Sequence, residues 1–272
     1  MTQVNVLVLS GYGLNCDHET AHAFKLAGAH ADRIHINAII DESVTLDKYH
    51  ILVFGGGFSW GDDHGAGVVQ AVRLKTHSGE KILQFINEGK LVIGICNGFQ
   101  TLVNMGLLPG FDKDYTMRSV ALTHNDCGNF RDQWVHLNVN KKSPCVFTRE
   151  LSHVEFPVRH GEGKFYADPN VIERLEKNNQ VVLRYALENG EPANGLFPDN
   201  PNGSIKDIAG ICDTTGRVFG LMPHPEAYHH FTNHPDWTLT KEMLRRQEKS
   251  MTPGMTSGIK LFRNAVLYME NA

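Results

Sequence analysis

An apolar run ends at a cysteine in the stretch Leu91-Val92-Ile93-Gly94-Ile95-Cys96-Asn97-Gly98-Phe99-Gln100. The run predicts a strand, and the apolar spacing that follows predicts a helix. Glycines flank the cysteine and omit the side chains that would crowd a tight turn between strand and helix. Such an elbow lifts its central residue toward a cleft, and the helix N-terminus favours the thiolate. The pattern therefore indicates a nucleophilic Cys96, although a buried structural cysteine also fits this stretch alone.

A second apolar segment ends in a histidine and a glutamate, in Val218-Phe219-Gly220-Leu221-Met222-Pro223-His224-Pro225-Glu226. The two prolines restrict the backbone around His224. Alternation along an extended segment sends His224 and Glu226 to the same side, so the carboxylate can hold one ring nitrogen while the other faces a sulfur. Cys96, His224 and Glu226 are thus candidates for nucleophile, base and orienting group. A solvated histidine in a proline-rich turn is the alternative for this segment alone.

These two stretches resemble the signatures of the class I (triad-type) glutamine amidotransferases. Three further motifs are similar, in order, to the glutaminase subunits of phosphoribosylformylglycinamidine synthase: Asn15-Cys16-Asp17, Gly55-Gly56-Gly57-Phe58-Ser59-Trp60-Gly61-Asp62 and Asn200-Pro201-Asn202-Gly203-Ser204. The resemblance runs from residue 4 to residue 226 and is looser between 138 and 180. It implies a flavodoxin-like α/β fold, with a mixed, mainly parallel sheet flanked by helices and a nucleophile elbow.

The resemblance implies an enzyme that hydrolyses L-glutamine to glutamate and ammonia through a γ-glutamyl thioester on Cys96. The ammonia would pass to a large, ATP-dependent synthetase subunit in de novo purine (IMP) biosynthesis, and a small third subunit is also expected. ATP and magnesium are expected on the synthetase, with no cofactor on this chain. A glutaminase that serves a different synthetase, and a non-catalytic regulatory module of the same fold, are the alternatives.

The glycine-rich turn Gly55-Gly56-Gly57 has two interpretations. The resemblance assigns the backbone N–H of Gly57, together with that of Asn97 beside the nucleophile, to an oxyanion hole, for which small residues suffice. A phosphate-binding loop is the other interpretation. The turn lacks the Lys-Ser/Thr ending of such a loop, and its spacing does not suit a dinucleotide turn. We therefore expect no nucleotide site here.

The resemblance also implies contacts with the substrate glutamine. Gln100 lies one helical turn after Cys96 and is expected to face the same cleft, with a glutamine on the helix surface as the alternative. Asn125 and Phe130 fall where the family borders its glutamine pocket, although Cys127 stands in place of the family's serine. The segment 160–164 is similar to a family stretch near the active-site mouth and predicts a loop that contacts the synthetase, unless it is a plain charged turn.

Length and composition limit the remaining classes. We expect one glutamine amidotransferase domain over residues 1–272, with a surface insertion at 228–258 and a C-terminal helix at 259–270. The net charge of −4 gives no reason to expect a nucleic-acid partner. No apolar run is long enough for a membrane span, and the N-terminus does not look like a signal peptide. Five scattered cysteines favour a reducing compartment, so the cytoplasm is expected.

A cluster of histidines invites a metal interpretation. It comprises His224, His229, His230 and His234. We expect no metal site, because the triad histidine, thiolate and carboxylate already have catalytic roles.

Strands and helices alternate in the first half of the chain, which predicts parallel pairing. The expected strands are 4–9, 33–38, 51–54 and 91–95, and the expected helices are 17–27 and one within 67–88. Extended patterns at 118–123, 134–139 and 153–158 predict additional strands, so the sheet should be mixed. Turn residues 213–216 predict a hairpin between 207–212 and 217–222. Residues 188–206 predict a loop, and residues 237–246 an extra surface helix.

Overall fold

The computed structural model describes residues 3–249 and 254–272. Its centre is a nine-stranded sheet in the order β2-β1-β3-β4-β11-β10-β9-β6-β7, and β5 and β8 form a separate pair. The strands are β1 (Asn5–Ser10), β2 (His30–His35), β3 (Ile51–Phe54), β4 (Leu91–Ile95), β5 (Val120–Thr123), β6 (Arg131–Val139), β7 (His153–His160), β8 (Lys164–Ala167), β9 (Val181–Ala186), β10 (Ile208–Cys212) and β11 (Val218–Leu221). The first five strands of this order are parallel and the others pair antiparallel. The predicted mixed sheet is confirmed.

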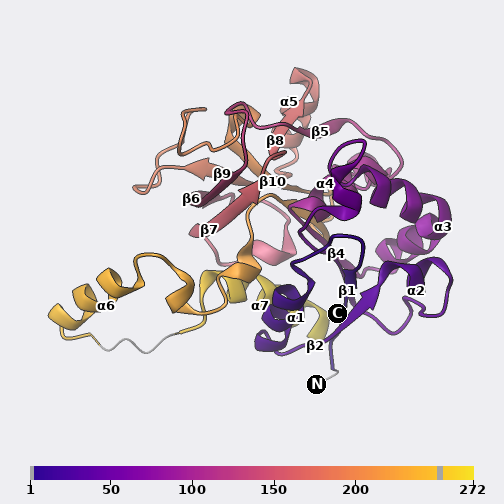
Figure 1. The fold of residues 1–272 in the computed structure, drawn as a ribbon, viewed down its shortest axis with the longest axis horizontal. Coiled ribbons are helices and arrows are strands. Elements are labelled where there is room, and N and C mark those ends of the chain that lie inside the picture. The colour runs from indigo at the N-terminus through magenta and orange to yellow at the C-terminus, as the bar shows by residue number, and fades with distance from the viewer. Residues whose placement is uncertain (1–2, 250–253) are drawn as a thin grey trace.

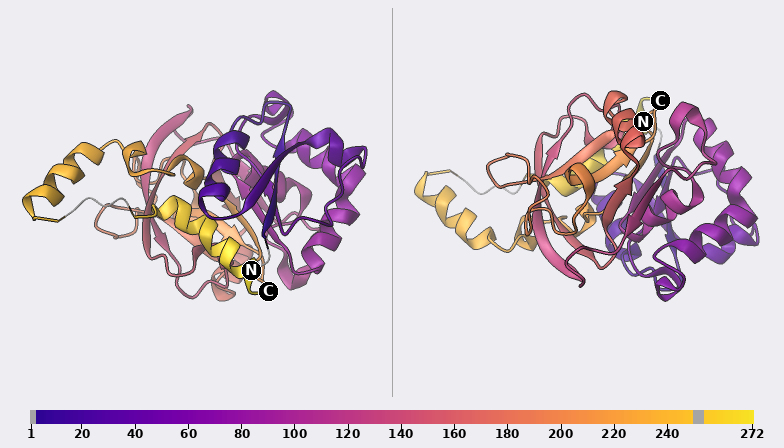
Figure 2. Two further views of the ribbon diagram at one scale, coloured as in Figure 1. Left: turned by 90° about the horizontal axis from the view of Figure 1, so that it is seen from below. Right: turned by 90° about the horizontal axis from the view of Figure 1, so that it is seen from above.

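Helices cover both faces of the parallel half of the sheet (Figures 1 and 2). The α-helices of the described residues are α1 (Asp17–Leu26), α2 (Ile36–Ile40), α3 (Val68–Asn87), α4 (Asn97–Met105), α5 (Pro169–Lys177), α6 (Trp237–Arg246) and α7 (Ser257–Glu270), of which α5 and α6 lie away from the parallel half. The rings of Phe24 and Phe262 lie 4.7 Å apart where α1 packs on α7. The α3 and α4 helices pack together on the opposite face. The crossover from β1 to β2 and the crossover from β3 to β4 run in opposite directions along the sheet, so right-handed connections place α1 and α3 on opposite faces.

The carboxyl ends of β4 and β11 lie side by side because these two strands are parallel neighbours. Leu221 pairs with Ile95, the residue before Cys96. Both strands are buried along their whole length, which explains their unbroken apolar sequences. The residues that follow β4 and β11 therefore leave the sheet side by side, at the carboxyl ends of these two strands.

Two parts of the sequence prediction differ from the structure. The strand expected at 33–38 begins and ends earlier, at β2, and its last residues belong to the short helix α2. The segment 164–186 contains β8, α5 and β9, none of which the sequence indicated. The region that resembled the family least is thus largely ordered structure at the antiparallel end of the sheet.

The C-terminal region contains two helices with different environments. The α7 helix, expected at 259–270, begins at Ser257 and packs on α1, with Ile259, Phe262 and Val266 buried. The α6 helix projects from the body as an arm (Figure 1), and none of its residues is buried.

Candidate active site

Cys96 occupies a sharp turn between β4 and α4. Its backbone has φ 52° and ψ −107°, a conformation that non-glycine residues rarely adopt and that is typical of a nucleophile elbow. The N–H of Cys96 donates to the carbonyl of Leu221 at 2.8 Å, so the elbow is attached to the end of β11. Its thiol is 4% exposed and donates to the carbonyl of Arg159 at 3.6 Å. The structure therefore places Cys96 at a strained turn beside the C-terminal end of β11.

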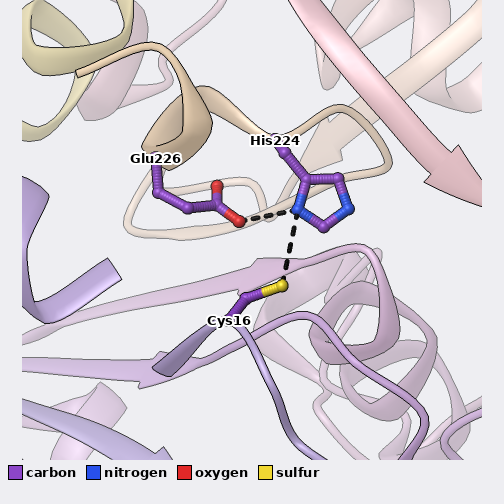
Figure 3. Close-up of side chains that lie close together, drawn as sticks. All are labelled: Cys16, His224 and Glu226. Carbon is purple, nitrogen blue, oxygen red and sulfur yellow. Dashed lines mark hydrogen bonds and ion pairs between the residues drawn. The ribbon is translucent and has the colours of Figure 1, made fainter. Parts of the chain in front are cut away.

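His224 and Glu226 follow β11 and form a buried pair (Figure 3). The Nδ1 atom of His224 lies 2.6 Å from Oε1 of Glu226, and the two residues are 1% and 0% exposed. The N–H of His224 donates to the carbonyl of Pro157 on β7 at 2.8 Å, which anchors the turn. The carboxylate occupies one ring nitrogen, as the spacing predicted, and leaves Nε2 for the nucleophile.

The electrostatics of His224 favour the protonated ring. Burial alone lowers the pKa of an imidazole, but the carboxylate of Glu226 and the nearby Cys96 outweigh it and raise the pKa of His224 well above its usual value. The Nε2 atom is buried and has no hydrogen-bond partner within residues 3–249 and 254–272. A buried ring that is poised to carry a proton and has one free nitrogen can serve as a general acid and base.

Asn97 follows Cys96 directly and Gly57 lies in the loop after β3; an oxyanion hole formed by their N–H groups stays a prediction. Gly57 has φ 141°, and a Cβ atom there would lie 2.6 Å from the carbonyl oxygen of Gly13. The N–H of Gly57 donates to no protein acceptor in the described part of the chain. The side chain of Asn97 accepts from the N–H of Ser59 at 3.3 Å and so joins the elbow to the glycine turn. This contact joins the start of α4 to the loop that contains Gly57.

The three residues expected to contact glutamine have different environments. Gln100 is buried, not on the helix surface; its Oε1 accepts from Asn97 at 3.2 Å and its Nε2 donates to the carbonyl of Glu162. Asn125 is also buried, with its amide bonded to the backbone of His160 and Gly163 at 2.9 and 3.0 Å. In this structure both side chains hold the turn after β7. Phe130 is half exposed instead.

The comparisons with known proteins agree over almost the whole chain. Residues 3–269 match the CobB/CobQ-like glutamine amidotransferase domain. Phosphoribosylformylglycinamidine synthase subunit PurQ of Methanococcus maripaludis is 45% identical over 265 residues, with 97% of each chain covered. The PurQ subunit of Dehalococcoides mccartyi is 43% identical, with 98% of each chain covered. The chain belongs to the PurQ family of glutamine amidotransferases.

A solved structure supports the same family. The chain is similar to one in the structure of PurLQS from Thermotoga maritima, with 29% identity, a TM-score of 0.68 and coverage of 98% of this chain and 100% of that one. A glutamine amidotransferase of the same organism aligns with a TM-score of 0.55 at 14% identity, which concerns the fold alone. The resemblance found in the sequence and the predicted fold class are confirmed. No helix in the described residues is long and apolar enough to cross a membrane.

The PurQ-family chain has a cavity of about 270 Å³ beside the triad histidine. The predicted site residues Gly57, Phe130 and His224 line it, together with six residues that the sequence did not assign to the site: Asn15, Cys16, Glu19, Phe58, Asp132 and Arg159. Glu19 and Arg159 form an ion pair across it at 3.3 Å. Asn15, Cys16 and Phe58 had a signal in the sequence, because they belong to the family motifs.

Cys16 is a second thiol close to the triad. Its Sγ lies 4.0 Å from Nδ1 of His224 (Figure 3), and its N–H donates to the carbonyl of Gly56 at 3.3 Å. Burial raises the pKa of the Cys16 thiol to about 11, so this sulfur is protonated near neutral pH. It lies at the start of α1 and not at an elbow, which distinguishes it from Cys96.

His160 is a second buried histidine in the PurQ-family site. Burial and the neighbouring His224 lower its pKa to about 3, so the ring is neutral. Its Nδ1 lies 3.2 Å from Oδ1 of Asn125, and its backbone carbonyl accepts from the same amide. The segment 160–164 is thus tied to Gln100 and Asn125 from within, and contact with a synthetase stays a prediction.

Proposed function

We propose that this chain is the glutaminase subunit of phosphoribosylformylglycinamidine synthase in purine biosynthesis. The observation that carries the proposal is the meeting of the strained Cys96 elbow with the buried His224–Glu226 pair at one sheet edge, in a chain of the PurQ family. That combination supplies a nucleophile, a proton carrier and an orienting carboxylate for attack on a carboxamide.

The reaction follows from the roles of these groups. The Cys96 sulfur attacks the γ-carboxamide carbon of glutamine, while the oxygen that gains negative charge is stabilised by the N–H groups of Gly57 and Asn97. Because the raised pKa of His224 favours the protonated ring, the proton of Cys96 resides on His224 and the sulfur attacks as a thiolate. The ring then delivers that proton to the departing nitrogen, so that ammonia leaves and a γ-glutamyl thioester stays on Cys96. Water, activated by the same ring, then releases glutamate. Glu226 keeps Nδ1 occupied throughout and so directs Nε2 to the reacting atoms.

The ammonia is used by a partner protein. The relatives are named as subunits of a synthase, and the similar Thermotoga maritima chain belongs to a structure named PurLQS. We propose that this chain assembles with a large PurL-type synthetase and a small PurS-type subunit in the cytoplasm. The synthetase would bind ATP, magnesium and formylglycinamide ribonucleotide, with no cofactor on the glutaminase chain.

Glutamate release from glutamine tests the proposal. It is measured with the purified chain alone, and again with the synthetase and small subunit of the same organism, ATP and formylglycinamide ribonucleotide. We expect slow release by the chain alone and a large increase in the complex. Release that the partners do not change would favour a different synthetase. No release under any condition would favour the non-catalytic module.

A further inference from the structure

The triad histidine belongs to a second set of buried groups that does not include the nucleophile. One ligand atom from each of Cys16, His224 and Glu226 lies within 4.8 Å of the others, and all three residues are buried (Figure 3). A thiolate, an imidazole and a carboxylate are the donors that zinc prefers, at about 2.0 to 2.3 Å. The set lies on two distant segments, the loop before α1 and the turn after β11.

The carboxylate of Glu226 has one oxygen that accepts no hydrogen bond from the described residues. Glu226 is 0% exposed, and its Oε2 has no hydrogen-bond partner in the described part of the chain, because only Oε1 reaches His224. A buried carboxylate oxygen without a partner is costly, and a cation is one of the few groups that can satisfy it. Oε2 points away from Cys16 (Figure 3), so the carboxylate must rotate for this oxygen to bind a cation in the cluster. Its lack of a partner is an observation separate from the spacing of the cluster.

The separations suit a small thiophilic cation after a modest adjustment. Tetrahedral zinc requires about 3.3 to 3.6 Å between neighbouring N, O and S ligands. The observed distances are 2.6 Å from Nδ1 of His224 to Oε1 of Glu226 and 4.0 Å from Nδ1 to Sγ of Cys16. The third pair, Sγ of Cys16 and a carboxylate oxygen of Glu226, lies within 4.8 Å, so shifts on the order of 1 Å are needed to meet the requirement. Magnesium and calcium are poor candidates, since they prefer oxygen ligands.

An entry path leads to the cluster. Cys16 and His224 both line the cavity of about 270 Å³, which gives a hydrated ion access to the two atoms. The carboxylates of Glu19 and Asp132 also line this cavity, and since Arg159 pairs with Glu19, these three side chains leave one net negative charge. Acidic groups along the path raise the local concentration of cations.

We propose that Cys16, His224 and Glu226 form an inhibitory site for zinc. Binding releases the thiol proton of Cys16 to solvent and replaces the proton on Nδ1 of His224 with the metal. The ring is then a neutral imidazole with its one proton on Nε2, so it can neither accept the proton of Cys96 nor, as an imidazolium does, deliver one to the departing nitrogen. The zinc is therefore an inhibitor and not a resident cofactor, and it turns the glutaminase off by occupying the base. Only the activity measurement below depends on the proposed function.

Cobalt absorption tests the site without any activity. The Cys96→Ala chain, in which the nucleophile cannot be a ligand, is titrated with Co²⁺, and thiolate-to-cobalt charge transfer is recorded. We expect one Co²⁺ per chain with this band, displaced by Zn²⁺. The band should vanish in Cys96→Ala/Cys16→Ser and persist in Cys96→Ala/Cys127→Ser, a matched control with a thiol removed elsewhere. A band that survives loss of Cys16, or no binding at all, overturns the proposal. Cys16→Ala serves in the same way if the serine variant does not fold.

Inhibition of glutamate release gives the second measurement. Zinc should inhibit the unmodified complex reversibly, with activity restored by a chelator. Cys16→Ser should raise the zinc concentration for half-inhibition at least tenfold, relative to its own zinc-free rate. An unchanged value would show that zinc inhibits at a site without Cys16 and overturn the assignment of Cys16. If the chain has no glutaminase activity, the cobalt titration still decides the site.

Discussion

His224 and Glu226 are separated by one proline, yet Nδ1 and Oε1 lie 2.6 Å apart in a place closed to solvent. The carboxylate favours the protonated ring and so raises the pKa of His224. Its removal should therefore alter both the orientation of the imidazole and its affinity for protons.

Glu226→Gln should lower the rate of glutamate release by on the order of tenfold to a thousandfold, while the γ-glutamyl thioester still forms. The pKa of His224 should fall, so the limb of the kcat/KM profile that reports this ring moves to lower pH. Steady-state assays across pH and mass spectrometry of the trapped adduct measure the two effects. Glu155→Gln is a matched control, because Glu155 pairs with His234 at 2.9 Å outside the triad. An unchanged rate for Glu226→Gln would remove this residue from the mechanism.

Asp62 should make the free energy of unfolding depend on pH. Burial and the charge of Glu162 raise its pKa to about 6. A raised carboxyl pKa means that the unfolded chain loses this proton first, so the contribution of Asp62 to stability falls as pH rises from about 4 to about 6. Asp62→Asn should therefore gain stability relative to the unmodified chain across this window. Urea unfolding at several pH values measures the difference.

The control for Asp62 has the opposite sign. Hydrogen bonds from Ser43 lower the pKa of Asp41, so the stability that Asp41 contributes is present at neutral pH and lost in acid. Asp41→Asn should be less stable than the unmodified chain at pH 7 and approach it in acid. A difference between Asp62→Asn and the unmodified chain that does not vary with pH would contradict the assigned environment of Asp62.

Gly98 tests the packing of the elbow. A Cβ atom at this position would lie 1.9 Å from the backbone carbonyl oxygen of Phe54 in β3, and backbone cannot move aside as a side chain can. Gly98→Ala should destabilise the protein by about 1 to 3 kcal/mol, despite the higher helix propensity of alanine. Thermal or urea unfolding measures the change.

Gly79 is the matched control, since it also lies in a helix, α3, but a Cβ atom there meets nothing closer than 3.9 Å. Gly79→Ala should be neutral or stabilising by up to about 1 kcal/mol. Equal effects of the two substitutions would show that α4 is not packed as closely against β3 as described.

The sequence predicted those elements whose local pattern matches their environment. The strands 51–54 and 91–95 are continuous apolar runs because both faces are covered by helices, and their bounds agree with the structure. The strand β2 is at the edge of the sheet and mixes charged with apolar residues. The strand was therefore predicted too far along the chain, toward Ile36 and the helix that follows. The pairing of β9 with β10 contains register shifts that no local pattern reveals.

In the candidate site, too, the sequence revealed the residues whose geometry is local and missed the contacts between distant segments. The motifs around Cys96 and His224 were readable because the turn and the prolines dictate local geometry. The contact of Cys16 with His224 spans 208 positions of the chain and depends on how the loop before α1 crosses the end of β3. Contact of Asn125 and Gln100 with glutamine stays a prediction. The structure shows their amides bonded to the turn after β7, and these contacts depend on tertiary structure that the sequence pattern does not reveal.

We propose that Cys96 releases from glutamine the ammonia that the synthetase uses. The complex containing Cys96→Ala tests this proposal most directly. Formation of the amidine is measured with glutamine and, separately, with free ammonium as nitrogen donor. We predict that glutamine-dependent synthesis is abolished while ammonium-dependent synthesis is retained at the rate of the unmodified complex. Retained synthesis from glutamine, or equal loss with both donors in a complex that still assembles, would contradict the account.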